Sequence, residues 1–284
     1  MKRAFLLLVL FGFLLSLEGA LEVAGTIFPL YDLVKNIGGD KVKVNCLLPP
    51  GANPHLFEFT PGQLKKLKNV RIIFFIGHGV DEWVMKIKDT LPHAKMIIVD
   101  KGIPLIPVKG GGKVTYNPHY WLSIPCAIKI CENIKNALIV EDPQNEKIYK
   151  KNFKEYIEKL ITLHKELKEK LSPLKFRKLI TFHDAWPYFA RAFDLEILDT
   201  FEPSGAGEPS PRHLQELIQK IKKYNIKVIF VEPQLTSSIL DGVVESLSLK
   251  TIILDPLGGV EGRETYIELM KFNVTQVLKG LQNE

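Results

Sequence analysis

Cysteine is scarce in this 284-residue chain, which contains only Cys46, Cys126 and Cys131 and has no CxxC motif. An odd number of cysteines leaves at least one thiol without an internal partner. Cys126 and Cys131 lie five residues apart near one face of a predicted helix, which is poor geometry for a disulfide between them. We therefore expect all three cysteines to be small hydrophobic side chains in the core.

The chain also lacks an HExxH motif and any basic motif interleaved with aromatic residues. The first absence argues against an enzyme of the zinc hydrolase class, which needs an open coordination position and a general base beside the bound water. The second absence argues against nucleic acid as a partner. Much of the lysine alternates with glutamate in helical stretches, so the formal net charge of +6 indicates a solvated surface.

The apolar run over residues 4–17 is short for a membrane span. Two basic residues precede it and the small residues Gly19 and Ala20 follow it, the layout of a cleavable secretory signal over residues 1–20. Glu18 stands where a small residue is preferred before the cut, so a retained amphiphilic anchor is the alternative. No cysteine lies at the end of the signal to carry a lipid, so we expect a protein that is free in the periplasm.

Hydrophobic residues make up 46% of the chain and charged residues 25%, enough to bury a core in one large domain or two lobes. Short apolar runs alternate with longer amphipathic segments, an order typical of parallel sheets flanked by helices. The predicted strands cover residues 21–26, 42–48, 71–76, 96–99, 178–182, 196–199, 227–231 and 251–254. Helices are predicted over residues 31–37, 61–68 and 211–224, the last with Ser210 as its N-cap.

A long polar stretch after Asp142 has apolar residues at spacings of three and four. It predicts one long helix with Asp142 as N-cap and Pro143 at the first helical position. The fold class is therefore α/β, with two lobes joined by a rigid helix. The predicted organisation is a signal at residues 1–20, an N-terminal lobe at 21–140, a linking helix at 141–173 and a C-terminal lobe at 174–284.

Candidate metal ligands follow the ends of predicted strands, where loops converge in open α/β sheets. They are His55, His119, His183 and Asp255. Neutral imidazole and carboxylate are donors that zinc prefers, and four of them close a tetrahedral shell. The remaining histidines are expected to be solvent-facing or structural at positions 93, 164 and 213, whereas His78 lies either at the rim of the cleft or outside it.

Several motifs together resemble the metal-binding subunits of ABC uptake systems for zinc and manganese, the cluster A-I or TroA-like solute-binding proteins. They are "LLPPGANPHLFEFTPGQ", "NPHYWLSIP", "FHDAWPYFARAFDL", "EPSPRHLQELIQKIKKYNIKVIFVEPQ" and "LDPLGG". The resemblance covers essentially the whole chain after the signal. It implies two lobes of four-stranded parallel sheet bridged by one long helix, with the metal held between them. The first lobe would contribute His55 and His119, and the second lobe His183 and Asp255.

The resemblance also bears on the metal, because manganese members of the family tend to have Glu where this chain has His183. Imidazole suits zinc, whereas carboxylate and water suit manganese, so Zn²⁺ is the expected cargo and Mn²⁺ the alternative. Glu58 either orients His55 from outside the coordination shell or is an exposed loop acid. Two features depart from the family pattern: Ser123 replaces a common Asp, and a short glycine-rich loop stands where many zinc members have a histidine-rich one.

The predicted function is thus a monomeric, non-enzymatic binding protein that delivers a divalent metal to an ABC permease. Three alternatives remain open. They are a manganese or iron member of the same family, a metal-stabilised adhesin with this fold, and, least favoured, a zinc hydrolase. Because imidazoles bind metal only when neutral, affinity is expected to fall as pH drops through the histidine range.

Overall fold

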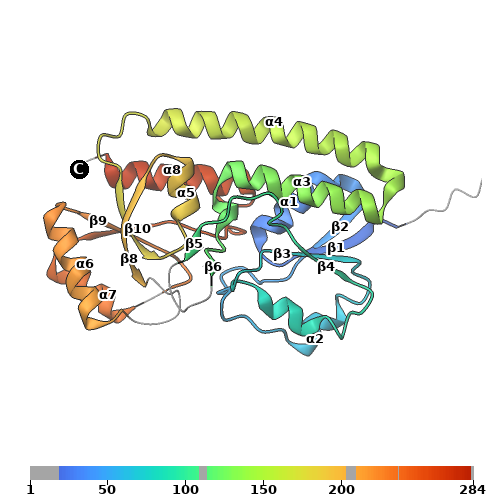
Figure 1. Ribbon diagram of the computed structural model, residues 1–284, viewed down its shortest axis with the longest axis horizontal. Coiled ribbons are helices and arrows are strands. Elements are labelled where there is room, and N and C mark those ends of the chain that lie inside the picture. Colours follow the sequence, from blue (N-terminus) through green and yellow to red (C-terminus); the bar gives the residue numbers. More distant parts are fainter. Residues whose placement is uncertain (1–18, 109–113, 203–208, 236, 283–284) are drawn as a thin grey trace, which may run out of the picture.

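The computed structural model describes residues 19–108, 114–202, 209–235 and 237–282, so residues 1–18 of the predicted signal at 1–20 lie outside the described residues. Two α/β lobes lie side by side, and a long helix runs across the top of both (Figure 1). The expected fold class is confirmed. No helix of the described residues combines the length and apolar character that crossing a bilayer requires.

The N-terminal lobe contains a four-stranded parallel sheet in the order β2-β1-β3-β4. Its strands are β1 (Leu21–Gly25), β2 (Val42–Cys46), β3 (Ile72–Phe75) and β4 (Lys95–Ile98). The helices of this part of the chain are α1 (Phe28–Gly38) and α2 (Pro61–Lys65), with 3-10 turns at Gly39–Lys41 and Glu82–Ile87. Strand β3 is apolar throughout because it is paired on both edges and buried on both faces.

The C-terminal lobe repeats this plan with the strand order β10-β9-β7-β8, again parallel. Its strands are β7 (Lys178–His183), β8 (Glu196–Glu202), β9 (Val228–Val231) and β10 (Lys250–Ile253). Its helices are α5 (Pro187–Ala192), α6 (Pro211–Lys223), α7 (Ser238–Ser246) and α8 (Tyr266–Leu281). The predicted cap of α6 is confirmed, since the Ser210 hydroxyl accepts a hydrogen bond from His213 N.

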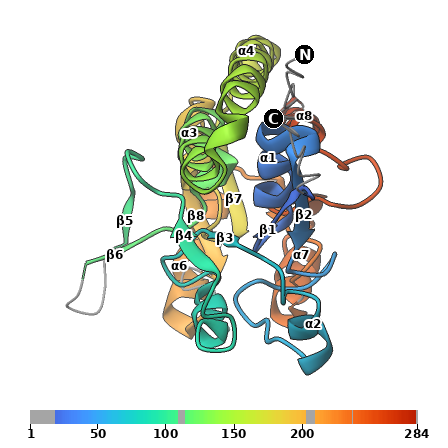
Figure 2. The ribbon, with the colours of Figure 1, turned by 90° about the vertical axis from the view of Figure 1, so that its right-hand side faces the viewer.

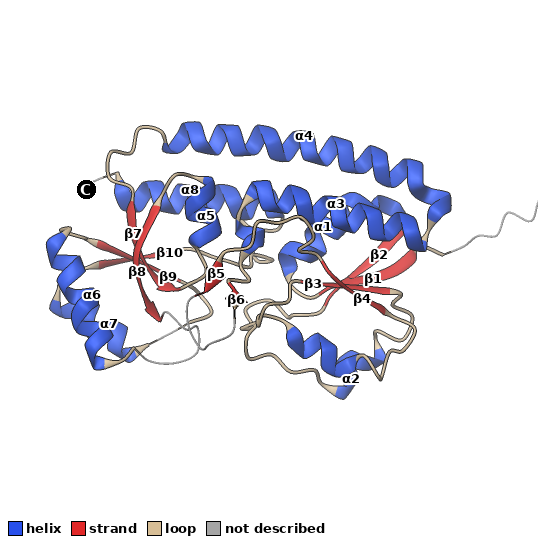
Figure 3. Cartoon of the chain, in the orientation of Figure 1, coloured by secondary structure: helices blue, strands red, loops and turns tan. Residues whose placement is uncertain are grey.

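Two helices connect the lobes (Figure 3). A short antiparallel pair, β5 (Pro107–Val108) and β6 (Thr115–Tyr116), precedes a 3-10 turn at Tyr120–Leu122, and α3 (Ile124–Glu141) and α4 (Glu146–Leu171) follow. The prediction for the start of the long helix is wrong in detail: a 3-10 turn at Pro143–Asn145 comes first. Asp142 is not a side-chain cap, because its carboxylate accepts from Asn145 and from the Tyr149 hydroxyl.

Helix α4 buries one stripe along its length, which the three-and-four spacing of its apolar residues predicts. The buried members are Tyr149, Tyr156, Leu160, Leu163, Leu167 and Leu171. At 1.5 Å per residue its 26 residues reach roughly 40 Å, long enough to lie over both sheets. Figure 2 shows α3 and α4 above the sheets, with α1 and α8 beside them.

Buried hydrogen bonds tie the lobes together. Trp121 Nε1 donates to the Pro256 carbonyl at 2.7 Å, and the Tyr266 hydroxyl donates to the Trp121 carbonyl at 2.7 Å. The Asp32 carboxylate in α1 accepts from Tyr266 N at the start of α8, at 2.9 Å. One hydrophobic core also runs continuously through residues of both lobes. These contacts and the shared core hold the two lobes against each other.

The cysteines only partly follow the prediction. Cys126 and Cys131 are buried in α3, as expected for small hydrophobic residues. Cys46 is exposed, because it is the last residue of the edge strand β2, where no further strand covers it.

Candidate metal centre

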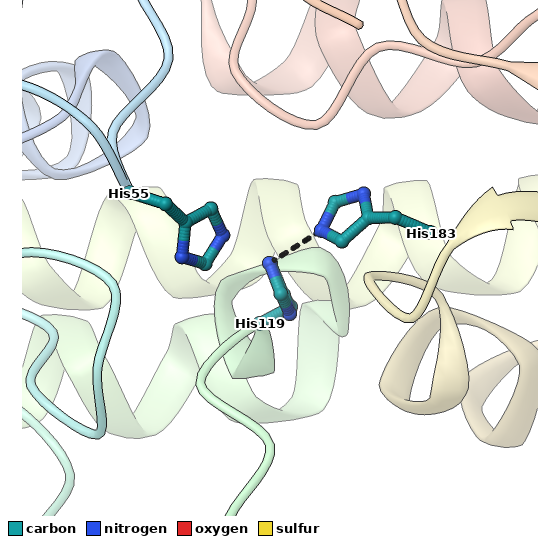
Figure 4. A group of neighbouring side chains, drawn as sticks. All are labelled: His55, His119 and His183. Carbon is teal, nitrogen blue, oxygen red and sulfur yellow. Dashed lines mark hydrogen bonds between the residues drawn. The ribbon is translucent and has the colours of Figure 1, made fainter. Parts of the chain in front are cut away.

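Three histidines from distant parts of the chain converge between the lobes (Figure 4). Side-chain nitrogens of His55, His119 and His183 all lie within 4.8 Å of one another. The closest pair is His119 Nε2 and His183 Nε2, at 3.2 Å. The three rings border a cavity of about 20 Å³, which has room for about one water molecule or one ion.

His183 is the last residue of β7, so the strand end places its side chain at the cleft. Its Nδ1 lies 2.7 Å from Glu232 Oε1, and both side chains are almost fully buried. Trp186 Nε1 donates to the same carboxylate oxygen at 3.0 Å. A carboxylate can only accept, so Nδ1 of His183 carries the proton and its Nε2 keeps a free lone pair.

His119 precedes the 3-10 turn at Tyr120–Leu122, and Asn117 fixes its ring. The Asn117 amide nitrogen donates to the Asp184 carbonyl at 2.6 Å, so its Oδ1 is the acceptor that lies 3.1 Å from His119 Nδ1. Nδ1 of His119 therefore donates, and its Nε2 is also left with a lone pair.

His55 lies in the loop between β2 and α2. Trp83 Nε1 holds this loop by donating to the Pro54 carbonyl at 2.8 Å, and the Trp83 ring packs against those of Phe57 and Phe59. Among the described residues, His55 Nε2 has no hydrogen-bond partner although it is buried. A buried polar atom without a partner is costly, so this nitrogen indicates a group that the polypeptide itself does not supply.

The short distance between the Nε2 atoms of His119 and His183 fits a shared cation. Two nitrogens bound to one zinc at about 2.05 Å with a tetrahedral angle are separated by roughly 3.3 Å. A hydrogen bond between them would need a proton on one Nε2, and because both Nδ1 atoms already donate, that ring would be a charged imidazolium. The arrangement suits a divalent metal better than an imidazole pair alone.

Burial keeps two of the imidazoles neutral. Desolvation, followed by the charge of His183, lowers the pKa of His55 to about 4, and desolvation with His183 and His55 lowers the pKa of His119 well below its usual value. Burial also acts to lower the pKa of His183, but the Glu232 carboxylate outweighs it and the pKa is raised. His55 and His119 thus favour the neutral form, whereas His183 is the ring that most readily holds a proton.

Asp255 lies outside the histidine group. Its Oδ1 accepts from the backbone nitrogens of Leu257 and Gly258 at 2.9 and 3.1 Å, and its Oδ2 lies 3.1 Å from Arg263 Nε. Glu58 is 78% exposed, and its carboxylate pairs with Lys86 at 3.0 Å instead of with the imidazole of His55. The structure thus brings together three of the four predicted ligands, while ligation itself stays a prediction.

The sequence does not reveal which residues orient the rings. Glu232 follows β9 in "VEPQ", and its position just past a strand end indicates an acid close to the site that is not itself a ligand, without giving its role. Asn117 carries no comparable signal, because its role depends on the distant carbonyl of Asp184. The other histidines have separate partners: His164 and His213 contact backbone carbonyls, and His78 lies 2.9 Å from Asp100.

Comparison with known proteins gives one consistent answer. The family model described as "Zinc-uptake complex component A periplasmic" matches residues 23–280. A manganese ABC transporter substrate-binding lipoprotein, PsaA of Streptococcus anginosus, is 30% identical over 92% of this chain and 89% of its own. The zinc-binding lipoprotein AdcA of Streptococcus pneumoniae is 28% identical over 94% of this chain and 57% of its own. The crystal structure of ZnuA superposes with a TM-score of 0.84 at 29% identity, covering 92% of this chain and 99% of that one.

Proposed function

The chain belongs to the zinc-uptake complex component A family, and from this premise we propose that it captures zinc for an ABC permease. It is a binding protein of a metal uptake system and not an enzyme. The proposed ligands are His55, His119 and His183, with Asp255 and Glu58 outside the histidine group in this structure.

One observation carries the proposal: the cavity is bordered by Nε2 atoms of two rings whose Nδ1 atoms are already committed to acceptors, and by a third Nε2 with no partner. The neutral rings of His119 and His183 therefore offer the cavity a lone pair each, and the nitrogen of His55 is free to offer a third. Convergent lone pairs attract a cation and repel an anion or a hydrogen-bond acceptor.

Zinc is favoured over manganese because all three grouped donors are nitrogens. Imidazole suits zinc, copper and nickel, whereas manganese prefers oxygen donors. Relatives named for zinc and for manganese both occur, so the identity of the cargo depends on the donors of this chain and not on its family.

Delivery to a permease places the protein outside the cytoplasm. We propose export by a cleaved signal at residues 1–20, a proposal that rests on the sequence pattern in the first twenty residues. We also propose that the protein acts in the periplasm as a monomer. The buried contacts between the lobes favour local loop movement over wide domain closure during loading and release.

Titration of metal-free protein with zinc, followed by calorimetry, tests the proposal. The wild type should bind one equivalent, and His183→Ala should lower the affinity by at least about a hundredfold because one of three donors is lost. His93→Ala, which removes an exposed histidine, is the matched control and should bind as the wild type does. Full stoichiometry and affinity in His183→Ala would refute the assignment of the ligands. Tighter binding of manganese than of zinc would show that Mn²⁺, the alternative, is the transported ion.

A further inference from the structure

Three histidines leave a tetrahedral zinc site one donor short. The carboxylate that the sequence suggests for this place, Asp255, is already engaged. Two backbone amides donate to its Oδ1, Arg263 pairs with its Oδ2, and the side chain is 2% exposed. Binding zinc with Asp255 would require breaking a buried ion pair and leaving Arg263 without its partner, which is expensive.

Gln234 contacts this carboxylate and also borders the cavity of the histidines. It borders the same cavity as the three imidazoles, and its Nε2 lies 3.3 Å from Asp255 Oδ1. The nitrogen must be the atom that faces Asp255, because a flipped amide would set two oxygen acceptors against each other. The amide orientation is therefore settled: Nε2 faces Asp255, and Oε1 is on the other side of the amide.

The oxygen of this amide has no partner among the described residues. Gln234 Oε1 is buried and has no hydrogen-bond partner among the described residues. The second such atom beside this cavity is His55 Nε2. Gln234 Oε1 can only accept, so a cation held in this cavity would satisfy it and would also be within reach of the ring of His55.

We infer that Gln234 Oε1 is the fourth donor to the bound zinc, an inference that rests on the proposed function of this site. Asp255 and Arg263 are then positioning residues. Arg263 holds Asp255, and Asp255 turns the Gln234 amide so that its oxygen is available to the ion. A neutral amide oxygen is a weaker donor than a carboxylate, which suits a site that must later release its cargo.

Two substitutions separate this arrangement from direct ligation by Asp255. Gln234→Ala should lower zinc affinity at least about tenfold, since a donor is removed. Asp255→Asn keeps an acceptor oxygen for Gln234 and for the two backbone amides, so it should lower zinc affinity by less than Gln234→Ala does. Its melting temperature should fall, because Arg263 then faces a neutral amide. Gln219→Ala on the exposed face of α6 is the matched control.

Binding of Co²⁺ in place of zinc adds a measurement that does not change when a substitution only lowers the stability of the fold. The visible absorption of bound Co²⁺ reports its coordination, so the spectrum should change most in Gln234→Ala, less in Asp255→Asn, and stay as in the wild type in Gln219→Ala. Gln234 is partly exposed, so its alanine variant is expected to fold, and its melting temperature verifies this.

The inference is overturned if Gln234→Ala keeps the wild-type affinity and Co²⁺ spectrum. It is equally overturned if Asp255→Asn loses more zinc affinity than Gln234→Ala, because the carboxylate would then move to the ion. Failure of the wild type to bind zinc at all would instead refute the proposed function, so the two failures are distinguishable.

Discussion

Nδ1 of His183 and Oε1 of Glu232 form a buried 2.7 Å hydrogen bond at the ends of the adjacent strands β7 and β9. The carboxylate fixes the tautomer of the ring and increases the basicity of the opposite nitrogen. Trp186 contributes a second hydrogen bond to the same oxygen, so Glu232 cannot rotate freely. The strand ends thus position a ligand and its orienting partner together.

Glu232→Gln should lower zinc affinity by about 10- to 100-fold without abolishing binding, as loss of a partner that orients a ligand typically does. The amide can still contact His183, but it carries no charge and can present its NH₂ group to the ring. Calorimetry on the variant measures the change. Glu216→Gln, in an exposed pair with Arg212 on α6, is the control and should bind zinc as tightly as the wild type.

Zinc affinity should fall as pH decreases, with the dependence of a single proton. The pKa of His183 is raised, while that of His55 is lowered to about 4 and that of His119 lies well below its usual value. As pH falls through the raised pKa, His183 gains a proton on Nε2 that zinc must displace. The affinity should then decrease about tenfold per pH unit, since one proton competes.

Dissociation constants measured between pH 8 and pH 5 check this slope. A loss of about a hundredfold per unit would mean that two rings titrate together, contrary to the separate environments of His183 and His55. An affinity independent of pH over this range would argue against histidine ligation altogether.

Bound zinc should raise the melting temperature, because only the folded chain brings the three histidines together. At a free zinc concentration about 1,000 times the dissociation constant, the stabilisation is about 4 kcal/mol. For a chain of this size, that corresponds to a rise of roughly 8 °C. Chelation should reverse the shift, and His183→Ala should show little of it; an equal shift in that variant would locate the zinc elsewhere.

The positions of all eight strands in the two main sheets were predictable from the sequence, because each contains apolar residues in a short segment between helical patterns. The central strands β3, β7 and β9 are the ones that the sheets bury most completely. Helix α8 was not predicted. Its buried face includes Asn273 and Gly280, which interrupt the apolar spacing. Asn273 is buried because it exchanges two hydrogen bonds with the backbone of Asp255, a contact between residues 18 positions apart that no local pattern reveals.

The same limit applies to the site. The histidines were predictable because the strand-end rule and the family motifs both indicate them. The orientation of Asp255 was not, because it depends on Arg263 and on two backbone amides of its own loop. Sequence thus predicts which residues come close to the cleft, whereas the partners of each side chain decide which donors remain free for a metal.

Tyr266 links the lobes, and this link gives a prediction about stability. Its hydroxyl donates to the Trp121 carbonyl at 2.7 Å, and both residues are completely buried. Tyr266→Phe removes the donor and leaves that carbonyl unsatisfied, which should lower the free energy of unfolding by about 1–3 kcal/mol. Trp121 is also next to the histidine cavity, and its indole contacts the ring of His119.

Denaturant unfolding of metal-free Tyr266→Phe measures the loss, with Tyr224→Phe at the end of α6 as control. Because the hydrogen bond orients the lobes and does not touch the proposed ligands, zinc affinity should fall by less than in Glu232→Gln. If Tyr266→Phe instead leaves stability unchanged and greatly weakens zinc binding, the lobes are not held by these contacts in the metal-free state. Zinc itself would then bring them together.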